Sequence, residues 1–121
     1  MFKPTEVRLL EKLQDKRGWI LCLAPNVVLL YTKRGYRRGG DYHRSTQTDV
    51  CLTGAVVFYW RSSDGEHSAL LLPGQSIQFP PNTPHYLEAV TDSLVLEWLE
   101  GEFEKEYDPE YRRRVEECLR E

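Results

Sequence analysis

The feature that most constrains the fold of this chain is a series of short β-rich runs separated by turn residues. Val, Leu, Phe, Tyr and Trp gather in the runs, and Gly, Pro, Asn and Asp stand between them. This spacing is typical of a β-sandwich or β-barrel, in which each turn returns the chain to a neighbouring strand. The predicted strands cover residues 19–24, 27–32, 55–61, 68–72, 76–79, 86–90 and 93–99.

Other segments are less sharply defined. Residues 7–13 fit either a first strand or a short helix, and their periodicity does not decide between the two. Residues 34–40 are rich in Gly and Arg and predict a loop, while 42–44 and 49–53 flank a short polar bend. The Asp-Gly pair within residues 62–65 indicates a hairpin between two strands.

Only the C-terminal end has a helical pattern. Asp108 is a suitable N-cap, Pro109 favours the first helical position, and good helix formers follow. We expect a short helix over about residues 108–120 that packs on the β-structure, with Arg112–Arg114 mostly solvated. Its apolar face consists of Tyr111, Val115, Cys118 and Leu119.

The composition limits the kinds of partner. With 121 residues, 40% of them hydrophobic, and a net charge of −3, the chain suits a single domain over residues 1–121. This charge gives no electrostatic reason to bind nucleic acid or an anionic membrane. The longest apolar runs, 27–31 and 55–60, are too short to span a bilayer, and the N-terminal residues lack the apolar core of a signal peptide.

The cysteines indicate a reducing compartment. Their number is odd and no CxxC pair occurs, so unpaired thiols and a cytoplasmic location are expected. Cys22 and Cys51 lie within apolar runs, where a thiol packs as a small hydrophobic side chain.

The residues most suggestive of function form two spaced motifs. In the first, over residues 35–54, two glycines enclose Asp41, His43 and Gln47. The spacing resembles the first motif of the cupin superfamily, which reads Gly, five residues, His-x-His, three or four residues, Glu, six residues, Gly. Asp41 stands at the position of the first histidine of that motif, and Gln47 stands at the position of the glutamate.

The second motif runs from Gly74 to Ala89 and resembles the second cupin motif. That motif reads Gly, five residues, Pro-x-Gly, two residues, His, three residues, Asn, and Gly74, Pro80 and His85 match it. Asn82 replaces the glycine and can adopt the same left-handed backbone, whereas Ala89 departs from the asparagine. The resemblance implies an all-β fold, the double-stranded β-helix or jelly-roll barrel of cupins, with a short C-terminal helix.

A narrower resemblance is to the sugar-nucleotide ketoisomerases of the same superfamily, which act on dTDP-4-keto-6-deoxyglucose. Their motif, Arg-Gly-x-His-x-His-Lys, is similar to residues 38–44, with His43 at the second histidine and Asp41 at the first. Residues 15–18 and 50–54 share this likeness. It implies an isomerase or epimerase that acts on a sugar or sugar nucleotide.

The cupin resemblance places the residues of both motifs in the barrel mouth. Two imidazoles and a carboxylate can hold a divalent ion such as Zn, Fe, Mn or Ni. The predicted metal ligands are therefore His43, His85, Asp41 and Gln47, with Asp49 as a substitute if the bend shifts register. The alternative is a degenerate site whose polar residues line a wet pocket, because Gln is a weaker ligand than Glu.

A metal-free acid–base site is the alternative hypothesis. An imidazole titrates near neutral pH, and a carboxylate beside it fixes its orientation. His43, His85 and Asp41 are therefore candidate catalytic residues for proton transfer next to a carbonyl group.

Several arginines precede or follow these residues. Guanidinium groups bind phosphates bidentately, so Arg37, Arg38 and Arg44 are candidates for binding a phosphorylated or nucleotide-linked ligand. Arg34 is a further candidate in the same loop. For each single arginine the alternative is a solvated loop.

Three functions follow from these features. The first is a small-molecule-binding cupin with a divalent metal, acting as a sugar isomerase or epimerase if it is an enzyme. The second is a non-catalytic, metal-free binding or sensor module, and the third is a metal-dependent dioxygenase. A homodimer is expected through an edge or exchanged strand within residues 2–13.

The remaining aromatic and histidine residues suggest structure more than function. Phe58, Tyr59, Trp60 and Trp98 are strand residues that suit the core or a dimer interface. His67 follows the Asp-Gly turn and is expected to be exposed and structural.

Overall fold

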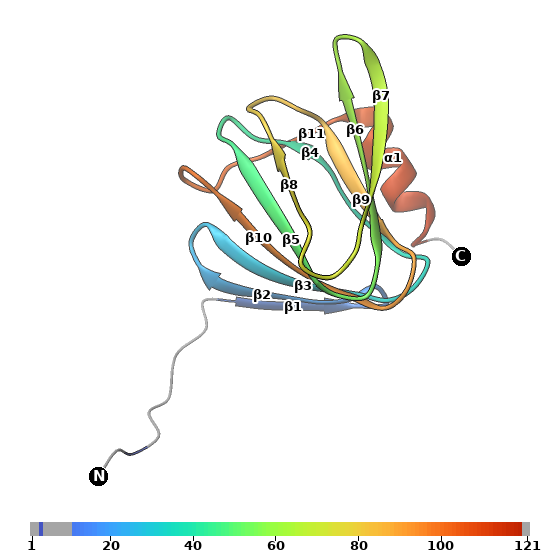
Figure 1. The fold of residues 1–121 in the computed structure, drawn as a ribbon. Coiled ribbons are helices and arrows are strands. Elements are labelled where there is room, and N and C mark those ends of the chain that lie inside the picture. Colours follow the sequence, from blue (N-terminus) through green and yellow to red (C-terminus); the bar gives the residue numbers. More distant parts are fainter. Residues whose placement is uncertain (1–2, 4–10, 120–121) are drawn as a thin grey trace.

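Two antiparallel β-sheets form a barrel with one helix beside it (Figure 1). The structure is a computed structural model, and it describes residue 3 and residues 11–119. In chain order the strands are β1 (Glu11–Asp15), β2 (Gly18–Ala24), β3 (Val27–Thr32), β4 (Arg37–Tyr42), β5 (Gln47–Thr53), β6 (Val56–Ser62), β7 (Gly65–Leu71), β8 (Ser76–Phe79), β9 (His85–Ala89), β10 (Ser93–Leu99) and β11 (Glu106–Tyr107).

The strand order is that of a jelly roll. One sheet has the order β1-β2-β3-β10-β5-β8, and the other has the order β11-β4-β9-β6-β7. Strands distant in sequence, such as β3 and β10 or β4 and β9, are antiparallel neighbours. The expected all-β fold, a double-stranded β-helix with a short C-terminal helix, is confirmed.

The core lies between the two sheets and follows from the period-2 alternation of side chains along each strand. Leu30, Val95 and Cys51 lie side by side on the inner face of the six-stranded sheet. They belong to one cluster with Phe58 and Leu87 of the five-stranded sheet. The barrel is closed by this cluster at one end and leaves polar residues at the other.

The helix α1 (Pro109–Glu117) packs on the outer face of the five-stranded sheet, against β4 and β9. Asp108 caps it by accepting a hydrogen bond from the Tyr111 amide at 3.1 Å, as the sequence predicts. Tyr111 forms a buried cluster with Val115 and Tyr86. Gly40 permits the close approach, since its φ is +82° and a Cβ there would lie 2.7 Å from the backbone of the helix.

Two sequence expectations about local structure are wrong. The predicted loop at 34–40 contains the first half of β4, because a β-bulge between Gly39 and Asp41 lets the strand continue through two glycines of positive φ. The arginines of the helix are also less solvated than expected. Only Arg113 is exposed, whereas Arg112 donates to the Gly39 carbonyl at 3.0 Å and Arg114 pairs with Glu66 at 2.8 Å.

Smaller differences concern segment ends. The strand expected at 68–72 begins earlier, at Gly65, because the hairpin turn is tighter than the sequence suggests. Of the uncertain segment 7–13, residues 11–13 belong to β1, and 7–10 lie outside the described residues.

Within the described chain, no helix has the length and apolar character needed to cross a membrane. Cys51 is fully buried, as expected, while Cys22 is half-buried on a cavity wall.

Candidate metal centre

A cavity of about 590 Å³ opens between the two sheets at the polar end of the barrel. One wall is apolar and comes from β2 and β3, including Ile20, Val28 and Leu30. The opposite wall comes from β4 and β9 and carries the polar residues of the two sequence motifs. The cavity therefore presents an apolar surface and a polar surface to one bound molecule.

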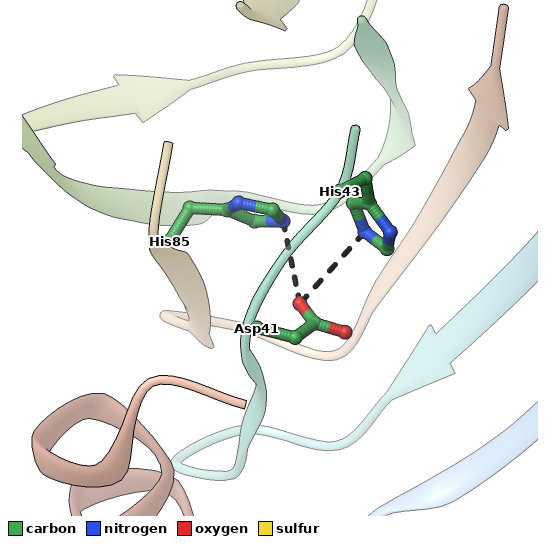
Figure 2. A group of neighbouring side chains, drawn as sticks. All are labelled: Asp41, His43 and His85. Carbon is green, nitrogen blue, oxygen red and sulfur yellow. Dashed lines mark ion pairs between the residues drawn. The ribbon is translucent and has the colours of Figure 1, made fainter. Parts of the chain in front are cut away.

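Asp41, His43 and His85 line this cavity. Figure 2 shows that the two imidazoles point toward the Asp41 carboxylate. Asp41 lies on β4 directly across from His85, the first residue of β9, and His43 follows the end of β4. The Asp41 Oδ1 atom is 3.5 Å from Nε2 of His85 and 4.0 Å from Nε2 of His43. The three potential ligand atoms all lie within 4.8 Å of one another.

Backbone carbonyl groups fix the orientation of both imidazoles. His43 donates from Nδ1 to the Glu104 carbonyl at 2.6 Å, and His85 donates from Nδ1 to the Thr83 carbonyl at 2.8 Å. Because a carbonyl oxygen only accepts, each Nδ1 carries a proton, and each Nε2 faces Asp41. Support of this kind is what metal-binding histidines require.

A backbone hydrogen bond joins the two sequence motifs. The Asn82 amide donates to the His43 carbonyl at 2.7 Å, which ties the loop before β9 to the end of β4. Asn82 has a φ of 63°, the left-handed conformation expected for the residue that replaces glycine. The contact from Glu104 was not predicted, because the segment before β11 is charged and has no strand pattern.

The donor set fits a divalent cation. Ligand atoms that share one ion at about 2.0–2.2 Å lie roughly 3 to 3.5 Å apart. The separations of 3.5 and 4.0 Å from Asp41 Oδ1 are close to this range, and small side-chain rotations must also bring the two imidazoles together, since the three ligand atoms lie within 4.8 Å of one another. Two imidazole nitrogens and one carboxylate oxygen suit Fe, Mn, Ni or Zn and leave coordination positions for a substrate or water.

Gln47, the fourth predicted ligand, has its amide nitrogen engaged elsewhere. It is 1% exposed, and its Nε2 donates to Asp49 Oδ2 at 2.6 Å and to Glu97 Oε1 at 3.0 Å. Asp49 and Glu97 are direct partners on β5 and β10 and face the barrel interior. The Gln47 amide nitrogen therefore serves the two carboxyl groups, while its amide oxygen is buried without a hydrogen-bond partner among the described residues.

The Asp49–Glu97 pair is an acidic feature that the sequence did not reveal in full. Burial raises the pKa of Asp49 to about 6, against hydrogen bonds from Glu97 and Gln47 that lower it. Burial and the Asp49 charge raise the pKa of Glu97 well above its ordinary value. The pair thus holds a proton near neutral pH, and Glu97 faces the cavity. A lone charge within the apolar run 93–99 was the available signal.

Of the arginines predicted from the sequence, Arg38 is the one that lines the cavity. It is 5% exposed, and it donates to Thr32 Oγ1 at 2.8 Å and to the Tyr31 carbonyl at 2.9 Å. Among the described residues no carboxylate forms an ion pair with it. Burial lowers the pKa of Arg38 to about 10, so its cationic group lies desolvated beside the space for a ligand.

The other predicted arginines lie elsewhere. Arg37 pairs with Glu88 at 2.7 Å and donates to the Arg114 carbonyl, on the side of the helix. Arg44 and Arg34 are exposed and do not line the cavity. Cationic side chains that sequence reasoning missed do line it, because distant segments bring them there: Arg17, Lys105 and Arg112.

The remaining candidate residues, the third histidine and the strand aromatics, pack against other side chains of the protein. His67 is half-buried, pairs with Asp64 at 2.9 Å and stacks on Trp60. Phe58 is in the core and Tyr59 stacks on Tyr86 beneath the helix.

Comparisons with known proteins concern the fold. The chain superposes on the capsular polysaccharide assembling protein CapF of Staphylococcus aureus with a TM-score of 0.69 and 18% identity, over 82% of this chain and 30% of CapF. It also superposes on oxalate decarboxylase of Bacillus subtilis, a protein with Mn(II) centres, with a TM-score of 0.67 and 19% identity, over 78% of this chain and 28% of the decarboxylase.

These solved structures are about three times as long as this chain, which covers less than a third of each. No family model matches the sequence, and no curated protein matches it. CapF and oxalate decarboxylase are cupins. The chain therefore has the cupin fold, a small jelly-roll barrel with a three-residue cluster able to hold a metal ion.

Proposed function

We propose that this protein binds a divalent metal ion through Asp41, His43 and His85 and a small molecule in the cavity beside it. The observation that carries the proposal is the convergence of both Nε2 atoms on one carboxylate oxygen, with each Nδ1 held by a backbone carbonyl. The Mn(II) centres of oxalate decarboxylase, which shares the fold, support a metal role here. A bound ion would polarise an oxygen atom of the ligand as a Lewis acid.

The ligand that suits this cavity is a small anion with an apolar part. Arg38 supplies a cationic group that lacks a carboxylate partner among the described residues, and buried cations favour anionic ligands. Ile20, Val28 and Leu30 would pack against the apolar part. Phosphate and carboxylate groups share the required chemistry.

If the protein is an enzyme, the site suits isomerisation or epimerisation of a sugar derivative. His43 and His85 would transfer a proton at a carbon beside a carbonyl, with Asp41 holding them in place. The similarity in fold to CapF, a capsular polysaccharide assembling protein, supports a carbohydrate derivative as the ligand. A dioxygenase would require bound Fe(II) and oxygen uptake.

Metal analysis of protein purified without a chelator or an affinity metal column tests the proposal. We expect near-stoichiometric metal in the wild type and an affinity at least about 10–100-fold weaker in His85→Ala and in Asp41→Asn. His67→Ala is the matched control, because this histidine pairs with Asp64 outside the cavity. Equal metal content in all four proteins would disprove the site.

A metal-free binding module is the second candidate. It is favoured by the carboxylate at the position of the first motif histidine and by the engagement of Gln47 with Asp49 and Glu97. No metal uptake after incubation with Fe(II), Mn(II), Ni(II) and Zn(II), together with binding of a keto-sugar nucleotide that depends on Arg38, would establish it. A cytoplasmic location, suggested by the odd number of cysteines and the absence of a CxxC pair, also stays a proposal.

A further inference from the structure

Residues 102–107, which we call the rim segment, lead from β10 to the helix and form one side of the cavity mouth. The segment ends in β11, which pairs with the end of β4 and places Tyr107 opposite Asp41 (Figure 1). Successive side chains of an extended segment point to opposite sides. The rim segment keeps this alternation, because Phe103, Lys105 and Tyr107 line the cavity and its three glutamates do not.

Two of these glutamates have partners outside the cavity. The Glu104 carboxylate accepts a hydrogen bond from the Arg44 amide at 2.5 Å, and the Glu106 carboxylate accepts one from the Tyr42 hydroxyl at 2.8 Å. The rim segment has the sequence Glu-Phe-Glu-Lys-Glu-Tyr. It therefore presents its one cation and its two aromatic rings to the cavity and keeps its acidic groups out of it.

The two rings hold the ammonium group of Lys105 at the mouth. Its Nζ atom lies 5.1 Å from the centroid of the Tyr107 ring and 5.8 Å from the centroid of the Phe103 ring. A cation over the face of an aromatic ring is attracted by the ring quadrupole, and this contact limits the positions that the long lysine side chain adopts. The rings are 48% and 49% exposed, so a molecule that enters the cavity can reach the group between them.

The cavity collects cationic side chains although the chain as a whole is acidic. The sequence has 16 Lys and Arg residues against 19 Asp and Glu residues, yet four Lys and Arg side chains line the cavity against two Asp and Glu side chains. Arg17 and Arg112 form ion pairs with nearby carboxylates, at 2.8 and 3.1 Å. Among the residues that the structure describes, Arg38 and Lys105 have no carboxylate partner.

These two cations lie on different sides of the candidate metal centre. Arg38 comes before Asp41 on β4, and its guanidinium extends toward β3, where it donates two hydrogen bonds. Lys105 belongs to the rim segment, which pairs with β4 at Asp41 and at the residue after it. At about 3.3 Å per residue of strand, the two side chains leave this wall on the order of 10 Å apart.

We propose that Lys105 binds the ligand and that, together with Arg38, it selects a molecule with two separate anionic groups, one on each side of the metal centre. The inference rests on the proposed function, in which Arg38 binds the first of these groups. A ligand with one anionic group leaves one of the two cations without a counter-charge, whereas a dianion of sufficient length interacts with both. The apolar wall from β2 and β3 suits the hydrocarbon part between the two groups.

Calorimetric titration with suberate and octanoate tests the inference, because the two carboxylates share one carbon chain and differ only in the second carboxylate group. We expect the wild type, as purified and after treatment with a chelator, to bind suberate about 5- to 10-fold more tightly, the size of one charged hydrogen bond at a partly open site. Lys105→Met should remove this preference and leave octanoate binding unchanged, whereas Lys105→Arg should retain it. Lys33→Met is the matched control, since Lys33 is exposed and lies outside the cavity.

Equal binding of suberate and octanoate by the wild type would overturn the inference, and so would a preference that persists in Lys105→Met. If both probes are still lost in Arg38→Met, the proposed anion site remains and only the role of Lys105 is wrong. If Arg38→Met binds both probes as the wild type does, the proposed anion site fails as well. Circular dichroism establishes that the variants are folded, and the exposed position of Lys105 leaves the barrel core unchanged.

Discussion

Replacing Glu97 by glutamine should stabilise the protein near neutral pH and have little effect in acid. Burial and the Asp49 charge raise the pKa of Glu97 well above its ordinary value, so the folded protein keeps this carboxyl protonated. Protonating a carboxyl of ordinary pKa about 4.3 at pH 7 costs about 3 to 4 kcal/mol. Glutamine is neutral at every pH and avoids this cost.

The direction of the pKa shift determines whether the free energy of unfolding rises or falls with pH. A carboxyl whose pKa is raised on folding contributes stability below its unfolded pKa and loses it as the pH rises through the folded pKa. For Asp49, with a folded pKa of about 6 against an ordinary value of 3.8, stability falls between about pH 4 and pH 6 by on the order of 3 kcal/mol. The effective dielectric constant of protein interiors is well above that of a dry medium and lowers both figures, so we expect a gain of about 1–3 kcal/mol for Glu97→Gln at neutral pH.

Urea unfolding followed by tryptophan fluorescence measures this gain. The free energy of unfolding is extrapolated to zero urea for wild type and Glu97→Gln at about pH 4, 6 and 8, with a chelator present to remove metal effects. The exposed Glu100→Gln variant is the control and should follow the wild type. A difference between Glu97→Gln and wild type that is the same at all three pH values would refute the reasoning.

Three further predictions concern single residues. Asp108→Ala removes the helix cap and the ion pair with Arg61, and should lower stability by about 1–2 kcal/mol in thermal or urea unfolding. Gly40→Ala should cost more than Gly74→Ala, since both have positive φ but only at Gly40 would a Cβ strike the helix backbone; equal midpoints would contradict this. Arg38→Met should abolish binding of a small anion measured by calorimetry, whereas Arg44→Met should leave it unchanged.

The sequence predicts the fold well where local signals agree with the final structure. The strands at 27–32, 76–79 and 93–99 match β3, β8 and β10, because turn residues flank each of these segments and their apolar or alternating pattern favours a strand. The start of the helix is likewise predicted by neighbouring residues, because Asp108 caps it and a proline follows directly. The prediction for 34–40 failed because two glycines usually end a strand, and the pairing with β9 that keeps β4 extended is a long-range contact.

The candidate site could be predicted only in part for the same reason. The motifs identify His43 and His85, and the structure brings them to Asp41. Glu97 and the Glu104 carbonyl come from segments more than fifty residues away from β4 along the chain, and no spacing rule joins them to it. Which arginine faces the cavity depends on strand alternation around the bulge, so Arg37 and Arg38 could not be separated by composition.

The bulge in β4 also explains how an aspartate can take a histidine's place in the cluster. Aspartate has a shorter side chain than histidine, so its contact with His85 depends on the position of its backbone. Here the register shift after Gly39 sets Asp41 directly opposite His85, and Oδ1 comes within 3.5 Å of Nε2. Replacing Asp41 by histidine would place a longer ring against His85, and that residue need not improve the site.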